Sequence, residues 1–339
     1  MFWFAATCCR WPALSAACSI VEPPAGTLMM TSLHQQFRKH GFVHIPGVLS
    51  GDEVDAARRH IDDAYASASA QRQERDLQLR HLFKTPELTA LAFKDNVTAA
   101  IRDALGGPFS TIGSIHIQRN AFGVGTPGSG WHTDSDSEIA HDYLWRPDFR
   151  FAKCGIYFQD NSREWGGGID LVPGSHTIPR LTPNAAMNWR IKVLRDRFNK
   201  RFHFKTVPVK RGDLLVFDYR MHHKASWPWA VQTPEFINSN QIINIPDDHK
   251  KYVLYWDVGS HDSTLRYLEH SKTRAETERG GRPAPFFGAF LRYHFPNDFP
   301  DSFIRQSEEA GVEVLTLPAD EASHFMAKHR PDDATVNPA

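Results

Sequence analysis

The chain has 339 residues, enough for a large buried core, and its 39 basic and 39 acidic side chains give a formal net charge of zero. Such a balance provides no overall field that would attract nucleic acid or an anionic membrane, so neither is expected as a partner. The sequence lacks an uninterrupted run of about 18 apolar residues, which argues against a membrane-spanning helix.

The cysteines and the two ends of the chain set the expected compartment and domain bounds. Three of the four cysteines lie within the first 18 residues, which leaves Cys154 alone in the body. A lone cysteine cannot form a disulfide framework, so a reducing, cytoplasmic location is favoured. Residues 1–28 lack the basic start of a secretory signal; we expect a disordered or spurious extension there, with an organellar targeting peptide as the alternative. One domain is predicted over residues 29–330, with a frayed tail at 331–339.

Helical signals come first in the body of the chain. Residues 33–41 favour a short helix that ends at a glycine, and residues 42–46 favour a strand. Ser50 and Glu53 have the spacing of a capping box, and apolar residues at helical spacing follow them. A further helix is expected between residues 88 and 105, where two glycines would stop it.

Strands dominate the chain beyond residue 110. β-Branched and aromatic residues, bounded by Gly, Pro, Asn or Asp, predict strands at residues 112–122, 151–159, 169–172, 214–219 and 252–256. Residues 184–204 have a helical pattern, and residues 190–205 carry seven Lys or Arg. A solvated face is the favoured interpretation of this basic helix; the alternative is attraction of a substrate carboxylate or of a phosphorylated carrier such as coenzyme A. Residues 302–311 favour a last helix, and no repeat or second core is apparent.

One short stretch carries the chemistry. His132 and Asp134 are two residues apart, and in an extended chain residues i and i+2 point to the same face. One carboxylate and two imidazoles can hold a divalent iron on one side and leave coordination positions open for a co-substrate and dioxygen. His222 and His223, at the end of a predicted strand, are the candidates for the second imidazole. Neighbours in a strand face opposite sides, so only one of them can join the pair.

Three sequence motifs occur in a telling order: WHTD at residues 131–134, GGGIDLVPGSH at 166–176 and RGDLLVFDYRMHH at 211–223. Together they resemble the phytanoyl-CoA dioxygenase family of iron(II)/2-oxoglutarate-dependent oxygenases, over about residues 33–260. The resemblance implies a mainly β fold with flanking helices and a double-stranded β-helix core of the jelly-roll or cupin-like type. It also implies that a small organic molecule is hydroxylated with dioxygen while 2-oxoglutarate is decarboxylated to succinate.

The resemblance assigns the iron(II) ligands residue by residue. The family spacing Asp-x-Arg-x-x-His ends at His223, so His132, Asp134 and His223 are the expected ligands. His222 is then expected to have a packing or supporting role. Asp134 indicates hydroxylation, because relatives that halogenate lack this carboxylate.

The co-substrate site is where the chain departs from its family. Family members place an Arg shortly beyond the distal His to bind the distal carboxylate of 2-oxoglutarate, but position 234 is Pro, and no Arg lies between Arg220 and Arg266. The candidate cations are Lys250 and Lys251, Lys153, and a more distant Arg266 or Arg119. Arg220 is expected in a structural ion pair. Gln118 and Asn120 are candidate polar contacts, with ordinary strand-edge hydrogen bonding as the alternative.

Two other hypotheses stay open on the sequence alone. A non-catalytic β-helix domain would bind a metal or ligand without turnover, and the missing Arg supports it. A cupin-like enzyme would use another metal without 2-oxoglutarate. The sequence specifies neither the substrate nor the oligomeric state.

Overall fold

The computed structural model describes the chain from residue 32 to residue 316, with gaps. The described residues are 32–67, 76–77, 82, 85–120, 122–124, 130–134, 144, 146, 148–177, 185–226, 242–277 and 299–316. They fall within one unit, Ser32–Ala339. The extension predicted at residues 1–28 and the tail at 331–339 lie outside the described residues.

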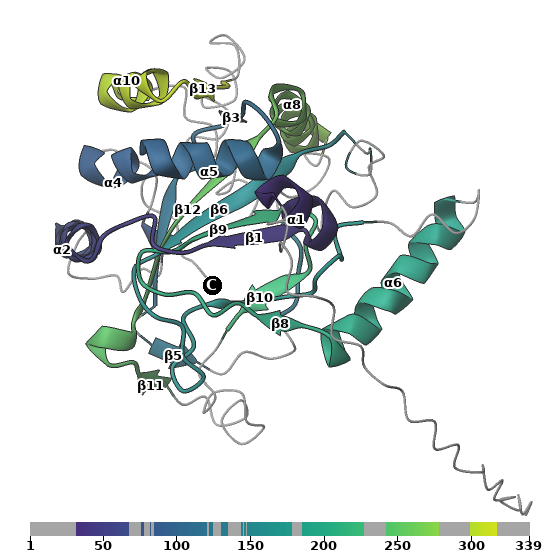
Figure 1. Ribbon diagram of the computed structural model, residues 1–339, viewed down its shortest axis with the longest axis horizontal. Coiled ribbons are helices and arrows are strands. Elements are labelled where there is room, and N and C mark those ends of the chain that lie inside the picture. Colours follow the sequence, from purple (N-terminus) through teal and green to yellow (C-terminus); the bar gives the residue numbers. More distant parts are fainter. Residues whose placement is uncertain are drawn as a thin grey trace, which may run out of the picture. The chain divides into compact units, whose positions relative to one another are not determined.

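Most of the elements described before residue 110 are helices, and most of those from residue 110 onward are strands (Figure 1). The helices are α1 (Leu33–His40), α2 (Gly51–Ser67), α4 (Pro86–Ala90), η1 (Leu91–Phe93), α5 (Asp95–Leu105), α6 (Ala185–Phe202), η4 (Asp247–His249), α8 (His261–Thr277) and α10 (Asp301–Glu309). The strands are β1 (Phe42–Ile45), β2 (Asp76–Leu77), β3 (Ser110–Thr111), β4 (His116–Asn120), β5 (Phe122–Val124), β6 (Phe151–Tyr157), β7 (Ile169–Leu171), β8 (Lys205–Thr206), β9 (Leu214–Asp218), β10 (His223–Ala225), β11 (Ile242–Asn244), β12 (Lys251–Gly259) and β13 (Glu313–Val314). Among the described residues, no helix has the length and apolar character needed to cross a bilayer.

The end of α1 and the start of α2 lie where the sequence signals predict. Gly41 has a φ of 82° and ends α1 in the left-handed conformation that glycine allows. At α2 the capping box forms in both directions: the Ser50 amide donates to Glu53 Oε2 at 2.8 Å, and the Glu53 amide donates to Ser50 Oγ at 3.3 Å. The single helix predicted between residues 88 and 105 is wrong. It is divided into α4, η1 and α5, because Lys94 is extended (φ −57°, ψ 144°) just before α5.

The strands form two main sheets. The larger has the order β1-β9-β6-β12-β3-β13, with β4 beside β12 and β2 beside β4; the smaller has the order β10-β7-β8. β5 and β11 pair separately. The larger sheet is mixed, because β13 joins β3 in parallel, and the described strands do not close into a continuous barrel. The predicted mainly β, jelly-roll-type fold with flanking helices is confirmed.

Some predicted boundaries need correction. Residues 112–122 were expected to form one strand, but residues 112–115 lie outside any strand, and β4 and the start of β5 follow them. The chain turns at Gly113 (φ 69°), where an added Cβ would lie 2.3 Å from the ring of Phe299. Helix α8 was not predicted, because two of its described buried residues, Ser263 and Thr264, are polar and give no apolar signal at helical spacing.

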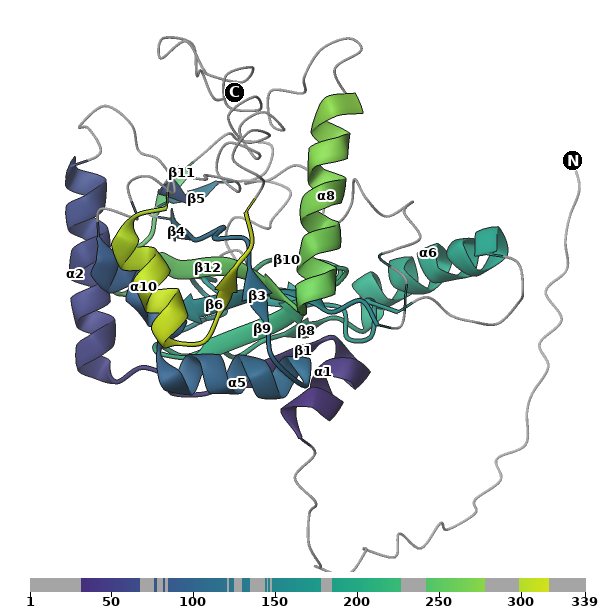
Figure 2. The same cartoon turned by 90° about the horizontal axis from the view of Figure 1, so that it is seen from above.

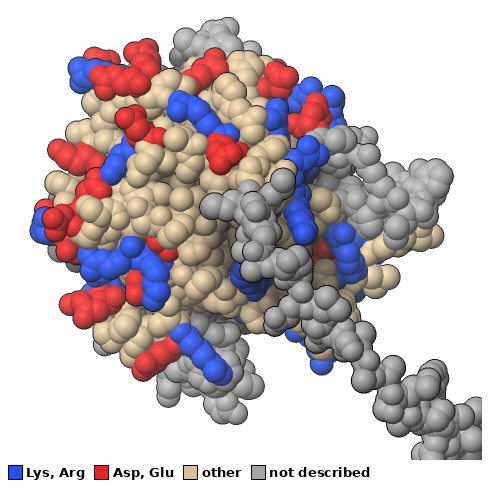
Figure 3. All heavy atoms as spheres, viewed as in Figure 1, with Lys and Arg blue, Asp and Glu red and all other residues tan. Residues whose placement is uncertain are grey.

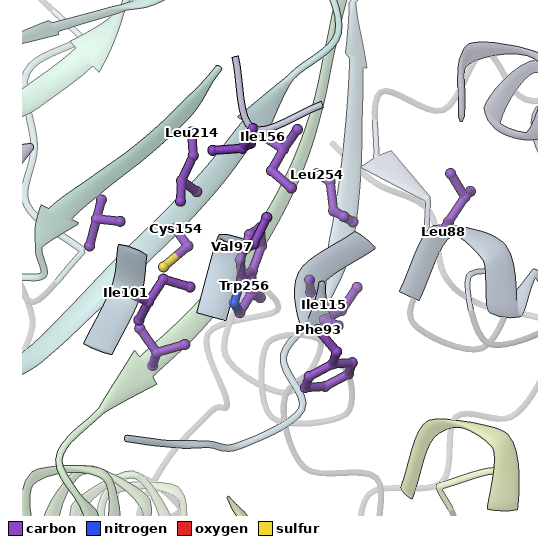
Figure 4. Packing of buried hydrophobic residues seen from close by; sticks show 14 of the residues in the cluster. Leu88, Phe93, Val97, Ile101, Ile115, Cys154, Ile156, Leu214, Leu254 and Trp256 are labelled. Atoms are coloured by element: carbon purple, nitrogen blue, oxygen red, sulfur yellow. The ribbon is translucent and has the colours of Figure 1, made fainter. Parts of the chain in front are cut away.

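The alternation of the strands separates two apolar layers. In β6, Cys154 and Ile156 pack outward against Val97 and Ile101 of α5 (Figure 4). Tyr157 points the other way, into a cluster that includes Ile169 and Leu171 of the smaller sheet. Figure 1 accordingly shows α5 across one side of the larger sheet, with β10 and β8 on the other. The space between the two sheets is where the functional side chains converge.

Candidate metal centre

Backbone pairing brings the two histidines of the candidate centre together. His132 forms an isolated bridge with His223: each amide donates to the other residue's carbonyl, at 3.0 and 2.9 Å. β10, which begins at His223, is itself paired with β7. His132 therefore extends the smaller sheet by one position, and the imidazole rings lie side by side with centroids 4.3 Å apart.

Each imidazole is oriented by a hydrogen bond at Nδ1. Nδ1 of His132 lies 2.9 Å from the carbonyl of Gly130, and Nδ1 of His223 lies 3.0 Å from that of Met221. A carbonyl only accepts, so both rings donate through Nδ1 and leave the lone pair of Nε2 available. The Nε2 atoms lie 4.0 and 3.8 Å from Oδ1 of Asp134.

These three side chains fit a divalent metal. One ligand atom from each of His132, Asp134 and His223 lies within 4.8 Å of the other two. Two neutral imidazoles and one carboxylate are the donors of the facial iron triad.

The charges around Asp134 keep it ionised. Burial disfavours its carboxylate, but the positive charge of Lys153, with smaller contributions from His223 and His132, lowers the pKa of Asp134 to about 2. Burial lowers the pKa of His223 to about 4, although Asp134 opposes this shift. A carboxylate and a neutral imidazole at neutral pH are the protonation states that metal binding requires.

Lys153 lies between two buried carboxylates. Its Nζ is 3.2 Å from Oδ2 of Asp134 and 3.9 Å from Oδ1 of Asp257, which is opposite Lys153 in the β6–β12 register. Asp257 also accepts a 2.6 Å hydrogen bond from the hydroxyl of Ser114. Burial raises the pKa of Asp257 despite the nearby Lys153.

A second cation lies inside the fold at the start of β12. Lys251 is 5% exposed, and its Nζ lies 5.6 Å from the centre of the Tyr255 ring. The Tyr255 hydroxyl is 3.4 Å from that of Tyr157. Burial lowers the pKa of His116 to about 3. The positive charges of Lys153 and Lys251 act in the same direction, and the negative charge of Asp134 opposes them. His116 is opposite Tyr255 in the β4–β12 register, and their ring centroids are 5.5 Å apart, so His116 lies next to the same tyrosine as Lys251.

Gly155 makes room for this arrangement. It lies between Lys153 and Tyr157 on the same face of β6, and it is opposite Tyr255 in the β6–β12 register. A Cβ at Gly155 would lie 2.8 Å from Cε1 of Tyr255. The absence of a side chain therefore lets the Tyr255 ring lie against the strand.

The other candidate cations lie elsewhere. Lys250 pairs with Asp247, whose side chain is 86% exposed. Arg119 pairs with Asp62 at 2.9 Å and covers the ring of Tyr65.

Arg220 is engaged by Asp218 through two hydrogen bonds of 2.8 and 2.6 Å, and it also donates to the carbonyl of Leu144. Arg266 is half-buried on α8. Gln118 lies on β4 opposite Val253, and the side chain of Asn120 is outside the described residues.

His222 points away from the triad. Its Nε2 lies 3.0 Å from Oδ2 of Asp196 on α6, and its amide donates to Ser175 Oγ at 2.9 Å. Asp196 also pairs with the buried Lys192, which donates to the Ser175 carbonyl at 2.6 Å. The adjacent histidines thus serve two different clusters.

Sequence reasoning missed His116, Tyr255, Asp257 and Asp196. For Tyr255 and Asp257 a signal exists, because they alternate with Lys251 along β12 and so share its face. Asp196 pairs with Lys192 at i,i+4 spacing, which the sequence does show, but its contact with His222, more than twenty residues away along the chain, carried no local signal.

Comparison with known proteins gives a family match over the same region. The family model described as "Phytanoyl-CoA dioxygenase (PhyH)" matches residues 37–227, more than half of the chain. An ectoine dioxygenase of Stutzerimonas stutzeri (strain A1501) is 32% identical over 154 residues, 42% of this chain and 49% of that protein. An ectoine dioxygenase of Halomonas elongata is 28% identical over 155 residues, 42% of this chain and 44% of that protein.

The aligned region spans about half the length of these curated relatives. Among solved structures, EctD from S. alaskensis with 2-oxoglutarate and 5-hydroxyectoine is similar, with a TM-score of 0.44 and 16% identity. That similarity covers 67% of this chain and 75% of the other.

Proposed function

Because the chain belongs to the phytanoyl-CoA dioxygenase family, we propose that it is an iron(II)- and 2-oxoglutarate-dependent oxygenase that hydroxylates a small organic molecule. The observation that carries this proposal is the convergence of His132, Asp134 and His223 with both Nε2 atoms turned toward one carboxylate oxygen. Bound iron(II) supplies the redox chemistry by which dioxygen is reduced while 2-oxoglutarate loses carbon dioxide.

In this proposal, hydrogen bonds and one ion pair within the protein orient the three side chains that bind the metal. The carbonyls of Gly130 and Met221 hold the two imidazoles in the tautomer that presents Nε2. Lys153 holds Oδ2 of Asp134, so that Oδ1 is the oxygen presented to the metal. Asp134 would then bind through one oxygen and leave coordination positions for co-substrate and dioxygen.

We assign the distal carboxylate of 2-oxoglutarate to Lys251. A buried ammonium can act as a point charge for a carboxylate, and two tyrosine hydroxyls nearby can add hydrogen bonds. Lys153 is a weaker candidate because Asp134 and Asp257 already engage its ammonium. Lys250 lies on the solvent side, paired with Asp247.

The substrate is a small molecule whose class we leave to experiment. Two curated relatives are named for ectoine, so ectoine is the first compound to test. The assay is succinate formation from 2-oxoglutarate with iron(II) and air, across a panel of ectoine, amino acids and lipidic acids. Substrate-dependent succinate formation is expected with at least one compound.

Iron and co-substrate binding can be tested without a substrate. Anaerobic addition of iron(II) and 2-oxoglutarate should produce a visible charge-transfer band in the wild type, and His132→Ala, Asp134→Ala or His223→Ala should abolish it. His203→Ala is the matched control, because His203 is exposed. Lys251→Met should raise, by tenfold or more, the 2-oxoglutarate concentration at which the charge-transfer band reaches half of its maximal intensity. Lys250→Met should leave that concentration unchanged.

These measurements separate the proposal from its alternatives. Metal binding without the band and without succinate would favour a non-catalytic domain. Turnover that requires a metal but proceeds without 2-oxoglutarate would favour a cupin-like enzyme. A band that persists in all three ligand variants would overturn the assignment of the metal centre.

A further inference from the structure

Exposed apolar side chains are concentrated on one helix. Among the described residues the exposed large apolar side chains are Met187, Leu194, Phe198, Phe202, Phe204 and Leu265, and all but the last belong to α6 or follow it directly. Leu194 is 65% exposed, Phe198 55% and Phe202 58%. Isolated exposed apolar residues are common, but a contiguous group marks a contact surface.

Leu194, Phe198 and Phe202 form a continuous row, because residues four apart are neighbours on a helix. The rings of Phe198 and Phe202 are 4.9 Å apart between centroids. A second row, made of the exposed residues Arg190, Arg197 and Arg201, runs beside the first. The guanidinium carbon of Arg201 lies 5.2 Å from the centre of the Phe202 ring.

On the opposite side of α6, two described residues are charged and buried. Lys192 is 1% exposed and Asp196 is 2% exposed, and they pair with each other. Asp196 also contacts His222 and Arg195. A surface helix ordinarily buries its apolar side; here ion pairs hold α6 to the protein, and much of its apolar surface is left outside.

The exposed side of α6 has positive charge only. Asp196 is the one acidic residue in α6, and it is buried among cations. Lys39 and Lys205 are further exposed cations outside the helix. Their charges, together with burial, lower the pKa of His40, so both lysines lie close to this histidine. Figure 3 shows acidic side chains over the α2, α4 and α10 side of the face, whereas toward α6 the described surface is mainly basic or uncharged. The net charge of zero therefore hides a local basic surface.

We propose that this side of α6 docks on an anionic lipid bilayer, with Leu194, Phe198 and Phe202 entering the boundary between headgroups and acyl chains. Arg190, Arg197 and Arg201 would contact the lipid phosphates. An apolar row beside a basic row is the pattern of helices that lie in a membrane interface. Figures 1 and 2 show α6 projecting from the sheets in both views.

Charge and side-chain chemistry disfavour two other occupants. A symmetric contact with a second copy would place the same arginine row against itself. A nucleic acid would satisfy the arginines, but Leu194 offers no ring for base stacking.

The test is co-sedimentation of the full chain with large unilamellar vesicles. We expect binding to phosphatidylcholine vesicles that contain phosphatidylserine, weak binding to pure phosphatidylcholine, and loss of binding as the salt concentration rises. The Leu194→Ser/Phe198→Ser/Phe202→Ser variant should lower the partition coefficient more than tenfold. The Arg197→Gln/Arg201→Gln variant should lower it about tenfold or more on the anionic vesicles, since one surface arginine contributes roughly fivefold.

Matched controls use exposed residues elsewhere. Leu265→Ser on α8 and Arg305→Gln on α10 should leave partitioning unchanged. Circular dichroism and 2-oxoglutarate binding should be the same for every variant, because none of these residues lies in the proposed metal or co-substrate site.

Three results would overturn the proposal. The first is wild-type protein that stays in solution with anionic vesicles at low salt. The second is equal partitioning of the wild type and the triple apolar variant. The third is a wild-type protein that does not bind vesicles but forms a dimer in sedimentation velocity or binds single-stranded oligonucleotides. In that case the triple apolar variant would lose the dimer or the oligonucleotide binding.

Discussion

The ammonium nitrogen of Lys153 lies 3.2 Å from Oδ2 of Asp134, whereas Oδ1 of the same carboxylate is the atom nearest to the imidazoles of His132 and His223. One carboxylate thus contacts Lys153 through one oxygen and faces the candidate metal position through the other. Lys153 also lies 3.9 Å from Asp257, so it is the cation between two buried acids.

Replacing Lys153 with Met should destabilise the metal-free protein by about 3 kcal/mol, because two buried carboxylates lose their nearby ammonium. Adding iron(II) or cobalt(II) should recover more stability in this variant than in the wild type, since the metal then supplies the missing positive charge. Thermal unfolding with and without metal, under nitrogen, measures both effects. Lys250→Met at the surface is the control and should change neither. Equal metal-induced stabilisation in Lys153→Met and wild type would contradict the shared-carboxylate interpretation.

Replacing Arg220 with Lys should destabilise the fold by about 2–3 kcal/mol and leave 2-oxoglutarate binding unchanged. Arg220 donates two hydrogen bonds to Asp218 and one to the Leu144 carbonyl, a planar pattern that a lysine cannot reproduce. Urea unfolding and co-substrate titration of the folded fraction measure the two quantities. The control is Arg211→Lys, at an exposed pair with Asp55, which should cost less than about 1 kcal/mol. A tenfold loss of co-substrate affinity with unchanged stability would instead make Arg220 a binding residue.

Replacing Asp196 with Asn should loosen α6. The substitution leaves the buried ammonium of Lys192 without its carboxylate and removes the acceptor of His222. We expect a loss of about 3 kcal/mol in stability and faster amide hydrogen exchange in α6 than in β10. Exchange read by mass spectrometry provides the measurement, with Glu308→Gln on α10 as an exposed control. Unchanged exchange in α6 would show that other contacts hold the helix.

Replacing Gly155 with Ala should weaken 2-oxoglutarate binding more than metal binding. The added methyl group would lie 2.8 Å from the Tyr255 ring, which must shift, and Lys251 contacts that ring. We expect a destabilisation of about 1–3 kcal/mol and a several-fold weaker co-substrate affinity, measured by anaerobic titration. Gly51→Ala is the matched control, because an added Cβ there meets no atom within 4 Å. Equal effects on metal and co-substrate would indicate a general disturbance of the site.

The residues alone predicted many of the local elements and brought together the core of the candidate metal centre. The capping box at Ser50 and Glu53 depends on contacts within one helical turn, so it forms as predicted. The spacing of His132 and Asp134 needs only an extended chain to bring them together. The family motifs then distinguished His223 from His222, which strand alternation alone could not do.

Tertiary structure decided which side chains join these residues. Lys251 rather than Lys250 enters the interior because β12 begins at Lys251 and pairs with β6 and β4 in one register, and a shift by one residue would exchange them. The same register brings Asp257 opposite Lys153. The orientation of α6 was equally unpredictable. An apolar row on a surface helix would be expected to face inward, but Asp196, paired with Lys192 and with His222, holds the opposite side of α6 to the protein, so the apolar row faces solvent. Both outcomes depend on partners far away in sequence, and local patterns carry no information about such partners.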